Sequence, residues 1–525
     1  MINSIVKRIQ GWVKIKGDTD GTNIGNVGDA LKMNITNVIE TKDSSNDKAA
    51  FGALAIAELS PYSVLDPLRG FDWRSHEKFT SGTGALSEIA DSGTSKEFKV
   101  SSGTSVGGYG VYRSKRSLGY LAGIGSLGRF TARFSSPVAL TIQRAGLQNI
   151  GNELAFGYEG TSFGIMYKRS ARPEIRTLTI ATASNQATNI TVTLNGVGFT
   201  VPVTNGSAQV NAEEIASFTG YGAWAAYANG STVIFQAQTV GALNGTYSAV
   251  PNSGNFVGSF TQSKAGATGT ETFITQANWN ENTLLSGDFI LDPTKGNVYQ
   301  VQLQYLGYGA IRFFVESPVT GSFILVHTIK YANSFTEPSL DNPDFKIGII
   351  VASTGSTTNM SVHSGSMALF HETSSRIPIE TDSHLFTRSG VGTTITSLLA
   401  LRKTAINESG ELALYDIRVV QMSMANEATK PVEYFLLLNP TFTTTQVWNF
   451  HSGSRNIQFS VAGGTVTRNT LGGELFVIGV PKTGNVQIDL DKLGIRLSND
   501  DILVLAARST SGTVEATGSL VWGEE

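Results

Sequence analysis

The chain has 525 residues and a net charge of −3, which is too long for one ordinary core and predicts two to four domains. Hydrophobic residues make up 40% and charged residues only 15%, which excludes a disordered chain. Basic and acidic residues are interspersed, so the basic stripe of a nucleic-acid-binding protein is absent and no nucleic-acid partner is expected. Cysteine is also absent, which excludes a disulfide scaffold, thiolate metal sites and cysteine catalysis.

Residues 2–13 place Ile2, Ile5, Val6, Ile9 and Trp12 at helical spacing and predict a short amphipathic helix. Such a helix either packs on its own domain or serves as a docking or trimerising element. We assign residues 1–50 to an N-terminal docking and oligomerisation segment. Lysine and arginine interrupt its apolar residues, so no cleavable signal is expected, and no apolar run in the chain is long enough for membrane insertion.

A turn cluster follows, in which Asp18, Asp20 and Asn23 resemble the start of a calcium loop. The EF-hand pattern requires glutamate at its twelfth position, and none is present. We therefore expect no metal here and no cofactor elsewhere.

From residue 51 onward, strand signals recur every eight to fourteen residues, each bounded by Gly, Ser or Asn. This spacing predicts an all-β fold of antiparallel β-sandwich or jelly-roll domains. The alternation of apolar and polar residues is clearest over residues 297–331. This segment predicts an antiparallel meander with turns at Gly307-Tyr308-Gly309 and at Pro318 to Gly321. We assign residues 51–176 plus 277–375 to one sandwich.

The segment 177–276 has its own alternating strands, turn residues and helix signal, and it predicts a small inserted domain of β-β-α-β-β order. Asn195-Gly196 joins two alternating runs, as in a two-residue hairpin turn. Asn211 precedes two glutamates and is the expected N-cap of the one internal helix.

Residues 376–525 predict a second β-sandwich. The segments VEYFLLLNP and DILVLAARS of this region carry large apolar residues at both odd and even positions, and so on both faces of a strand. Strands that are apolar on both faces need cover on both faces, which neighbouring subunits could provide. A homo-oligomer, most simply a trimer, is therefore expected.

Much of the chain resembles a family of virion structural proteins of tailed phages and large double-stranded DNA viruses. The opening GDTDGTNIGNVGDALKMNI is similar to that of many phage fibre and spike subunits. The pieces that carry the resemblance are AFGALAIAELSP, RSLGYLAGIGSLGRFTARF, NELAFGYEGTSFGIMYKRS, LDPTKGNVYQVQLQYLGYGAIRFFVESPVTGSFILVHTIKYAN, NMSVHSGSMALF, ALRKTAINESGELALYDIRVVQM, KPVEYFLLLNPTF and QIDLDKLGIRLSNDDILVLAARS. The resemblance implies a place in a virus particle, and it implies no catalytic residue.

Two short motifs match enzyme patterns by letters alone. Gly123 to Gly128 fits the dinucleotide-binding pattern and Gly103 to Gly107 fits the hydrolase elbow, but both are followed by strand-like sequence where a helix is required. The six histidines show no metal-ligand spacing, and His327 is expected in a core. Paired carboxylates of a polysaccharide-cleaving enzyme remain an alternative, and the candidates at predicted turns are Asp292, Glu316, Asp341 and Asp344.

Four aromatic residues, Tyr221, Trp224, Tyr227 and Trp279, are candidates for glycan contact if they lie on exposed loops, and they fill the inserted domain's core if they do not. We expect a non-enzymatic structural subunit of a virus particle, of the tailed-phage fibre, spike or decoration type. Its expected partners are copies of itself, other virion proteins bound through the N-terminal segment and a host-surface glycan. The alternative is a glycan-binding receptor-binding protein or tailspike depolymerase.

Overall fold

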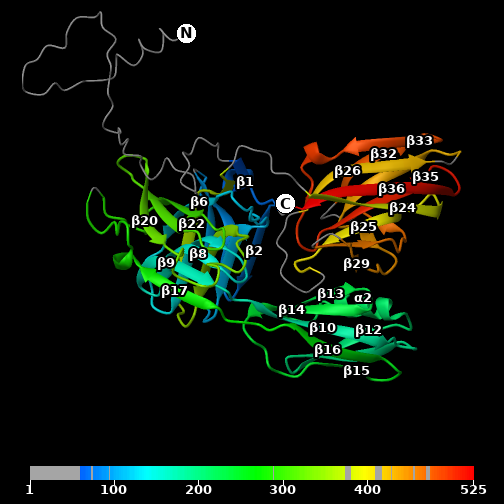
Figure 1. The fold of residues 1–525 in the computed structure, drawn as a ribbon, viewed down its shortest axis with the longest axis horizontal. Coiled ribbons are helices and arrows are strands. Elements are labelled where there is room, and N and C mark those ends of the chain that lie inside the picture. Colours follow the sequence, from blue (N-terminus) through cyan, green and yellow to red (C-terminus); the bar gives the residue numbers. More distant parts are fainter. Residues whose placement is uncertain are drawn as a thin grey trace, which may run out of the picture. The chain divides into compact units, whose positions relative to one another are not determined.

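A computed structural model describes residues 60–524 apart from 73–74, 94, 288, 373–379, 408–416, 427–428, 453–455 and 469–472. The predicted N-terminal helix, the Asp18–Asn23 cluster and the docking segment lie outside the described residues. The described part is mainly antiparallel β-sheet with one short α-helix, which confirms the predicted fold class (Figure 1).

The first sandwich packs two large sheets face to face. One sheet has the order β20-β19-β18-β6-β22-β4-β3, with β1 and β23 paired beside it, and the other has the order β17-β9-β8-β7-β21-β5-β2. The core lies between them, where Phe156 of β8 contacts Tyr299 of β18 at 4.7 Å and Phe313 of β19 at 5.6 Å between ring centroids. The strands of this sandwich are β1 (Ser60–Leu65), β2 (His76–Ser81), β3 (Leu86–Asp91), β4 (Lys96–Ser101), β5 (Tyr109–Ser114), β6 (Ser126–Phe134), β7 (Thr141–Gln148), β8 (Glu153–Glu159), β9 (Ser162–Arg169), β17 (Thr270–Thr275), β18 (Asn297–Leu303), β19 (Ile311–Glu316), β20 (Phe323–Ile329), β21 (Lys346–Ser353), β22 (Ser361–Ser364) and β23 (Met367–His371), with 3₁₀ turns η1 (Pro67–Arg69) and η2 (Gln276–Asn278).

The predicted meander is confirmed as β18, β19 and β20, which pair antiparallel in chain order. Both glycine motifs are followed by strands, since the Gly123 motif runs into β6 and the Gly103 motif is followed by β5. A nucleotide loop or nucleophile elbow would enter a helix at these points, so neither enzyme pattern is present.

The inserted domain begins at β10 and ends with β16, which pair with each other in one sheet. β17 then pairs with β9, so the chain rejoins the first sandwich at Thr270, ahead of the expected residue 277. The elements are β10 (Pro173–Thr182), β11 (Thr188–Leu194), β12 (Val197–Val203), α2 (Ala208–Ser217), β13 (Trp224–Asn229), β14 (Thr232–Val240), β15 (Ser248–Pro251) and β16 (Val257–Lys264), in sheets β13-β14-β10-β16 and β12-β11-β15. Three strands precede the helix and four follow it, so the predicted β-β-α-β-β order is wrong in number.

The predicted turn of the insert is confirmed, whereas the predicted helix cap is wrong. Asn195 and Gly196 join β11 to β12 with φ of 52° and 85°, the left-handed pair of a type I′ hairpin. Ser207 caps α2 through its side chain, which accepts from the Val210 N–H. Asn211 lies one turn inside the helix, where its amide bonds the chain at Ser184 N and Thr204 O. The helix starts earlier because Ser207 already satisfies a free N–H at its first turn.

The C-terminal region forms a sandwich of two sheets with its own core (Figure 1). Its sheets have the orders β24-β36-β26-β33, with β34 beside β26, and β29-β30-β25-β35-β27-β32. The strands are β24 (Glu380–Val391), β25 (Thr396–Lys403), β26 (Ile417–Asn426), β27 (Val432–Leu438), β28 (Thr441–Phe442), β29 (Asn449–Phe450), β30 (Ile457–Ser460), β31 (Val466–Thr467), β32 (Glu474–Val480), β33 (Gly484–Asp489), β34 (Arg496–Leu497), β35 (Ile502–Ser509) and β36 (Val514–Glu524), with the 3₁₀ turn η3 (Asp491–Leu493).

The second apolar face of β27 is covered by the same chain. Phe435 and Leu437 pack in a cluster with Trp448, which directly precedes β29, and with Val466 of β31. A neighbouring subunit is therefore not needed to cover β27. The two apolar faces of this strand no longer support the prediction of an oligomer. The trimer stays a prediction.

Candidate functional site

The four predicted glycan-contact aromatics are all buried. The exposed fractions are 2% for Tyr221, 7% for Trp224, 6% for Tyr227 and 5% for Trp279. Tyr221 and Trp224 lie in the insert's core, whereas Trp279 lies in the core of the first sandwich against Phe156. A buried ring offers no face to a sugar. These four residues are therefore core residues and not glycan contacts. Trp279 lies in the core of the first sandwich, and Tyr227 packs in a separate cluster with Ile406 and Phe450 of the C-terminal region, so neither belongs to the insert's core.

Exposed aromatic rings gather instead at one pair of loops of the first sandwich. Phe335 stacks on Tyr331 with ring centroids 4.2 Å apart and planes 17° apart, and Tyr308 lies 6.2 Å from Tyr331. Phe335 is 52% exposed and Tyr308 39%, while Tyr331 beneath them is 2% exposed. The Arg169 guanidinium lies 5.7 Å from the Tyr331 ring and 6.0 Å from the Phe335 ring. We call Arg169, Tyr308, Tyr331 and Phe335 the aromatic platform.

Hydrogen bonds hold the two loops of the aromatic platform together. The Tyr308 hydroxyl donates to Thr336 O at 3.0 Å, and the Ser339 N–H donates to Gly307 O at 2.7 Å. Arg169 Nη1 donates to the Tyr331 hydroxyl at 2.9 Å, which fixes the buried ring under Phe335. The exposed rings are therefore held in place before any ligand arrives, so binding would order few groups.

Charged side chains meet at a second place, where the insert contacts the C-terminal sandwich. Glu213 of α2 is 4% exposed and accepts a hydrogen bond from the Trp448 N–H at 2.9 Å. Burial raises the pKa of Glu213 to about 7, although Arg402 and the Trp448 N–H oppose the rise. Arg402 lies over the Trp448 ring at 4.5 Å and donates to Gln458 Oε1, while Gln458 Nε2 donates to Ala228 O at 2.6 Å.

The charges continue into the first sandwich. Lys346 Nζ lies 2.7 Å from Glu77 Oε1, which also pairs with Arg113. Burial lowers the pKa of Lys346 to about 8, and Glu77 opposes that shift. Burial would raise the pKa of Glu77, but Lys346 and Arg113 together hold it below its usual value. Lys346 also interacts electrostatically with Lys403 of β25, and Lys115 Nζ lies 3.7 Å from Asp501 Oδ1.

We call this set of ionisable groups the charged junction. Its members come from the insert, the first sandwich and the C-terminal sandwich, and they are Glu77, Arg113, Lys115, Glu213, Lys346, Arg402, Lys403 and Asp501. Buried charges of this kind are retained only when each has a partner. Glu213 and the Lys115–Asp501 pair make contacts between domains, whereas Glu77, Arg113 and Lys346 pair within the first sandwich.

The predicted carboxylate candidates make structural contacts. Asp344 accepts from the Tyr120 N–H at 2.6 Å, and Asp341 accepts from the Ser170 N–H at 3.2 Å. Asp292 accepts from Thr294, which lowers its pKa, and Glu316 ends β19. His327 is 7% exposed and accepts from the Asn280 N–H, which confirms its expected place in a core.

Among the residues that the structure describes, no group of three or more His, Asp or Glu side chains could hold a metal ion. Within the same residues, no helix is long and apolar enough to cross a membrane.

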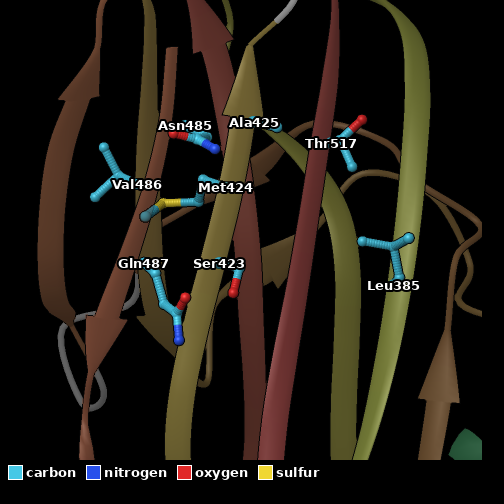
Figure 2. Close-up of a pocket in the computed structure, with 8 residues that line it drawn as sticks. All are labelled: Leu385, Ser423, Met424, Ala425, Asn485, Val486, Gln487 and Thr517. Atoms are coloured by element: carbon cyan, nitrogen blue, oxygen red, sulfur yellow. The ribbon is translucent and has the colours of Figure 1, made fainter.

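A shallow pocket of about 330 Å³ lies on the β24-β36-β26-β33 sheet of the C-terminal sandwich (Figure 2). The side chains that line it are hydroxyl, amide and apolar groups: Leu385, Ser423, Met424, Ala425, Asn485, Val486, Gln487 and Thr517. None of the eight is ionisable, so the pocket offers no group for acid–base chemistry.

No protein-family model matches the chain, and no curated protein sequence matches it. Solved structures of viral capsid proteins match it weakly. A structure of infectious bursal disease virus, Gx strain, has a TM-score of 0.15 at 8% identity over 78% of this chain and 75% of that chain. A structure of Sulfolobus turreted icosahedral virus has a TM-score of 0.14 at 10% identity over 89% of this chain and 97% of that one. TM-scores this low carry no argument about assembly or function.

The aromatic platform had one signal in the sequence. Tyr308 stands between two glycines in a predicted turn, and turns lie at the surface. Nothing local placed Phe335 or Arg169 beside it, because Arg169 lies more than a hundred residues away in the chain.

Proposed function

We propose that this chain is a non-catalytic structural subunit of a virus particle, of the tailed-phage fibre, spike or surface-decoration type. The observation that supports it most is where the resemblance falls in the fold. The segment 297–333 contains β18, β19 and β20, three consecutive paired strands that run from β6 to the edge of one sheet of the first sandwich, so most of the shared pattern belongs to the scaffold.

The β-sandwiches agree with such a role. Each has its own apolar core, and the charged junction and the insert add contacts between them. Antiparallel sandwiches of this kind present loops outward from a rigid scaffold. In the proposal, residues 1–50 dock on other virion proteins, three copies form the subunit, and the loops of the sandwiches face the host.

Mass spectrometry of purified particles, with antibody labelling by electron microscopy, tests the proposal. We expect the chain in the particle at a fixed stoichiometry, on the head, neck or tail. A chain that is found only in the soluble fraction of the lysate would contradict it. Light scattering on the purified chain tests the trimer separately, and a stable monomer at micromolar concentration would contradict that part alone.

Incubation with host capsule or lipopolysaccharide tests the absence of catalysis. We expect polysaccharide chains of unchanged length. Shortened chains, with the activity lost on substitution of a carboxylate pair, would show the depolymerase alternative to be right.

A further inference from the structure

The aromatic platform exposes apolar surface that the fold does not use. Phe335 has one ring face against Tyr331, so its 52% exposure comes from the opposite face and the edges. Tyr308 and Leu306 beside it are 39% and 55% exposed. Contact of these apolar groups with water is unfavourable, so a ligand that covers them gains free energy on binding.

The electrostatics of the rings define what fits on them. An aromatic face carries partial negative charge and attracts the partly positive C–H groups of a ligand that lies flat on it. The C–H face of a pyranose sugar has this character, while its hydroxyl groups point outward at the rim. A rigid ring pair is suited to such a ligand because few side-chain rotations are lost on binding.

Arg169 lies beside the rings, and two acidic residues follow Phe335 in the chain. Arg169 donates through Nη1, and in the described part of the chain its Nε and Nη2 have no hydrogen-bond partner. Glu337 and Asp341 follow Phe335 on the same loop and are exposed, and they supply acceptors. A neutral sugar satisfies donors and acceptors alike through its hydroxyl groups, whereas an anionic ligand would meet repulsion from the two carboxylates.

The size of the surface favours a sugar over a protein. Two exposed rings and one leucine make a small patch, while an interface between folded proteins buries about 800 Å² on each partner. We propose that the aromatic platform binds a neutral glycan, with a pyranose ring stacked on the exposed face of Phe335 and its hydroxyl groups bonded to Arg169 and the acidic loop. This inference goes beyond the proposed function, since it assigns a ligand whether or not the chain is part of a particle.

The test uses the full chain and defined sugars. Saturation-transfer NMR with methyl α-glucopyranoside, methyl β-galactopyranoside and maltohexaose provides neutral probes, and N-acetylneuraminic acid and oligogalacturonate provide acidic ones. We expect transfer to at least one neutral probe, strongest at ring C–H protons. Phe335→Ala should weaken its binding about tenfold or more, the loss of one stacked ring.

Phe79→Ala is the matched control. Phe79 is 46% exposed and has Arg113 5.4 Å from its ring centre, but it lies on β2, far along the chain from the aromatic platform. This variant should bind as the wild type does. Circular dichroism of each variant verifies its fold.

Four results would overturn the inference: no transfer to any neutral probe, transfer to the acidic probes alone, unchanged binding in Phe335→Ala, or equal loss in Phe79→Ala. A lower oligomer mass for Phe335→Ala by light scattering, without glycan binding by the wild type, would identify the surface as a protein interface instead.

Discussion

The aromatic platform and the charged junction depart from ordinary burial in opposite directions. At the platform a phenylalanine is 52% exposed, while at the junction a glutamate is 4% exposed. The platform uses apolar groups where water could reach them, and the junction places charges where water is excluded. Each departure is stabilised locally, the ring by the stacked Tyr331 and the charges by opposite charges and hydrogen bonds.

The difference shows what each region does for the fold. Charges at the junction hold domains to one another, so they should matter for stability and for its pH dependence. The exposed rings contact little of the chain, so they should matter for a ligand and hardly for folding. Four predictions test this contrast.

Removal of the insert should have the largest effect, because it takes away one side of the charged junction. Arg172 and Ala267 exchange two hydrogen bonds of 2.9 Å, so an Asn-Gly turn can join them in place of residues 173–266. Neither sandwich core contains a residue of this segment, so both should still fold cooperatively. The melting temperature should fall because the contacts of Glu213 and Gln458 are lost.

Calorimetry and circular dichroism check this outcome, with the full chain as reference. A deletion that also removes β17 is the informative comparison, because it opens the edge of the first sandwich and should cost more. Aggregation of the 173–266 replacement would show that the insert is part of the main fold.

Glu77→Ala should have the next largest effect. The change leaves Lys346 and Arg113 side by side without their shared counter-ion. Removal of one partner from a buried ion pair costs about 3–5 kcal/mol. Urea denaturation measures the loss, and Glu88→Ala, an exposed glutamate of β3, should change stability by less than about 0.5 kcal/mol. Equal losses in the free energy of unfolding for the two variants would show that the charged junction does not stabilise the fold.

Glu213→Gln should change how stability depends on pH. Because burial raises the pKa of Glu213 from 4.5 to about 7, the folded state binds a proton more tightly than the unfolded state does. Its contribution is therefore most favourable below about pH 4.5 and is lost as the pH rises through about 7, a change of about 3 kcal/mol.

Glutamine keeps the acceptor for the Trp448 N–H without the charge. The variant should match the wild type near pH 4.5 and be the more stable protein at pH 8, by up to about 3 kcal/mol. Thermal melts at the two pH values measure this. A variant less stable than the wild type at pH 8 would show that attraction to Arg402 outweighs burial.

Phe335→Ala should have the smallest effect on folding. Its loss removes one stacked pair at the surface, worth about 1 kcal/mol or less. The same urea experiment measures it. A loss of unfolding free energy as large as that of Glu77→Ala would show that the exposed ring stabilises the fold as much as the buried charges do.

The sequence by itself determined the all-β class, the meander of β18 to β20 and the hairpin at Asn195-Gly196, because alternation and turn chemistry are local properties. It misplaced the helix cap, since Ser207 and Asn211 are both good cap residues and only the start of the helix distinguishes them. The tertiary structure alone decided which aromatic rings are exposed, because burial depends on what packs opposite. It also decided that β27 is covered by its own chain at Trp448, and that Arg169, Tyr308 and Phe335 meet, since contacts between distant segments have no periodicity to reveal them.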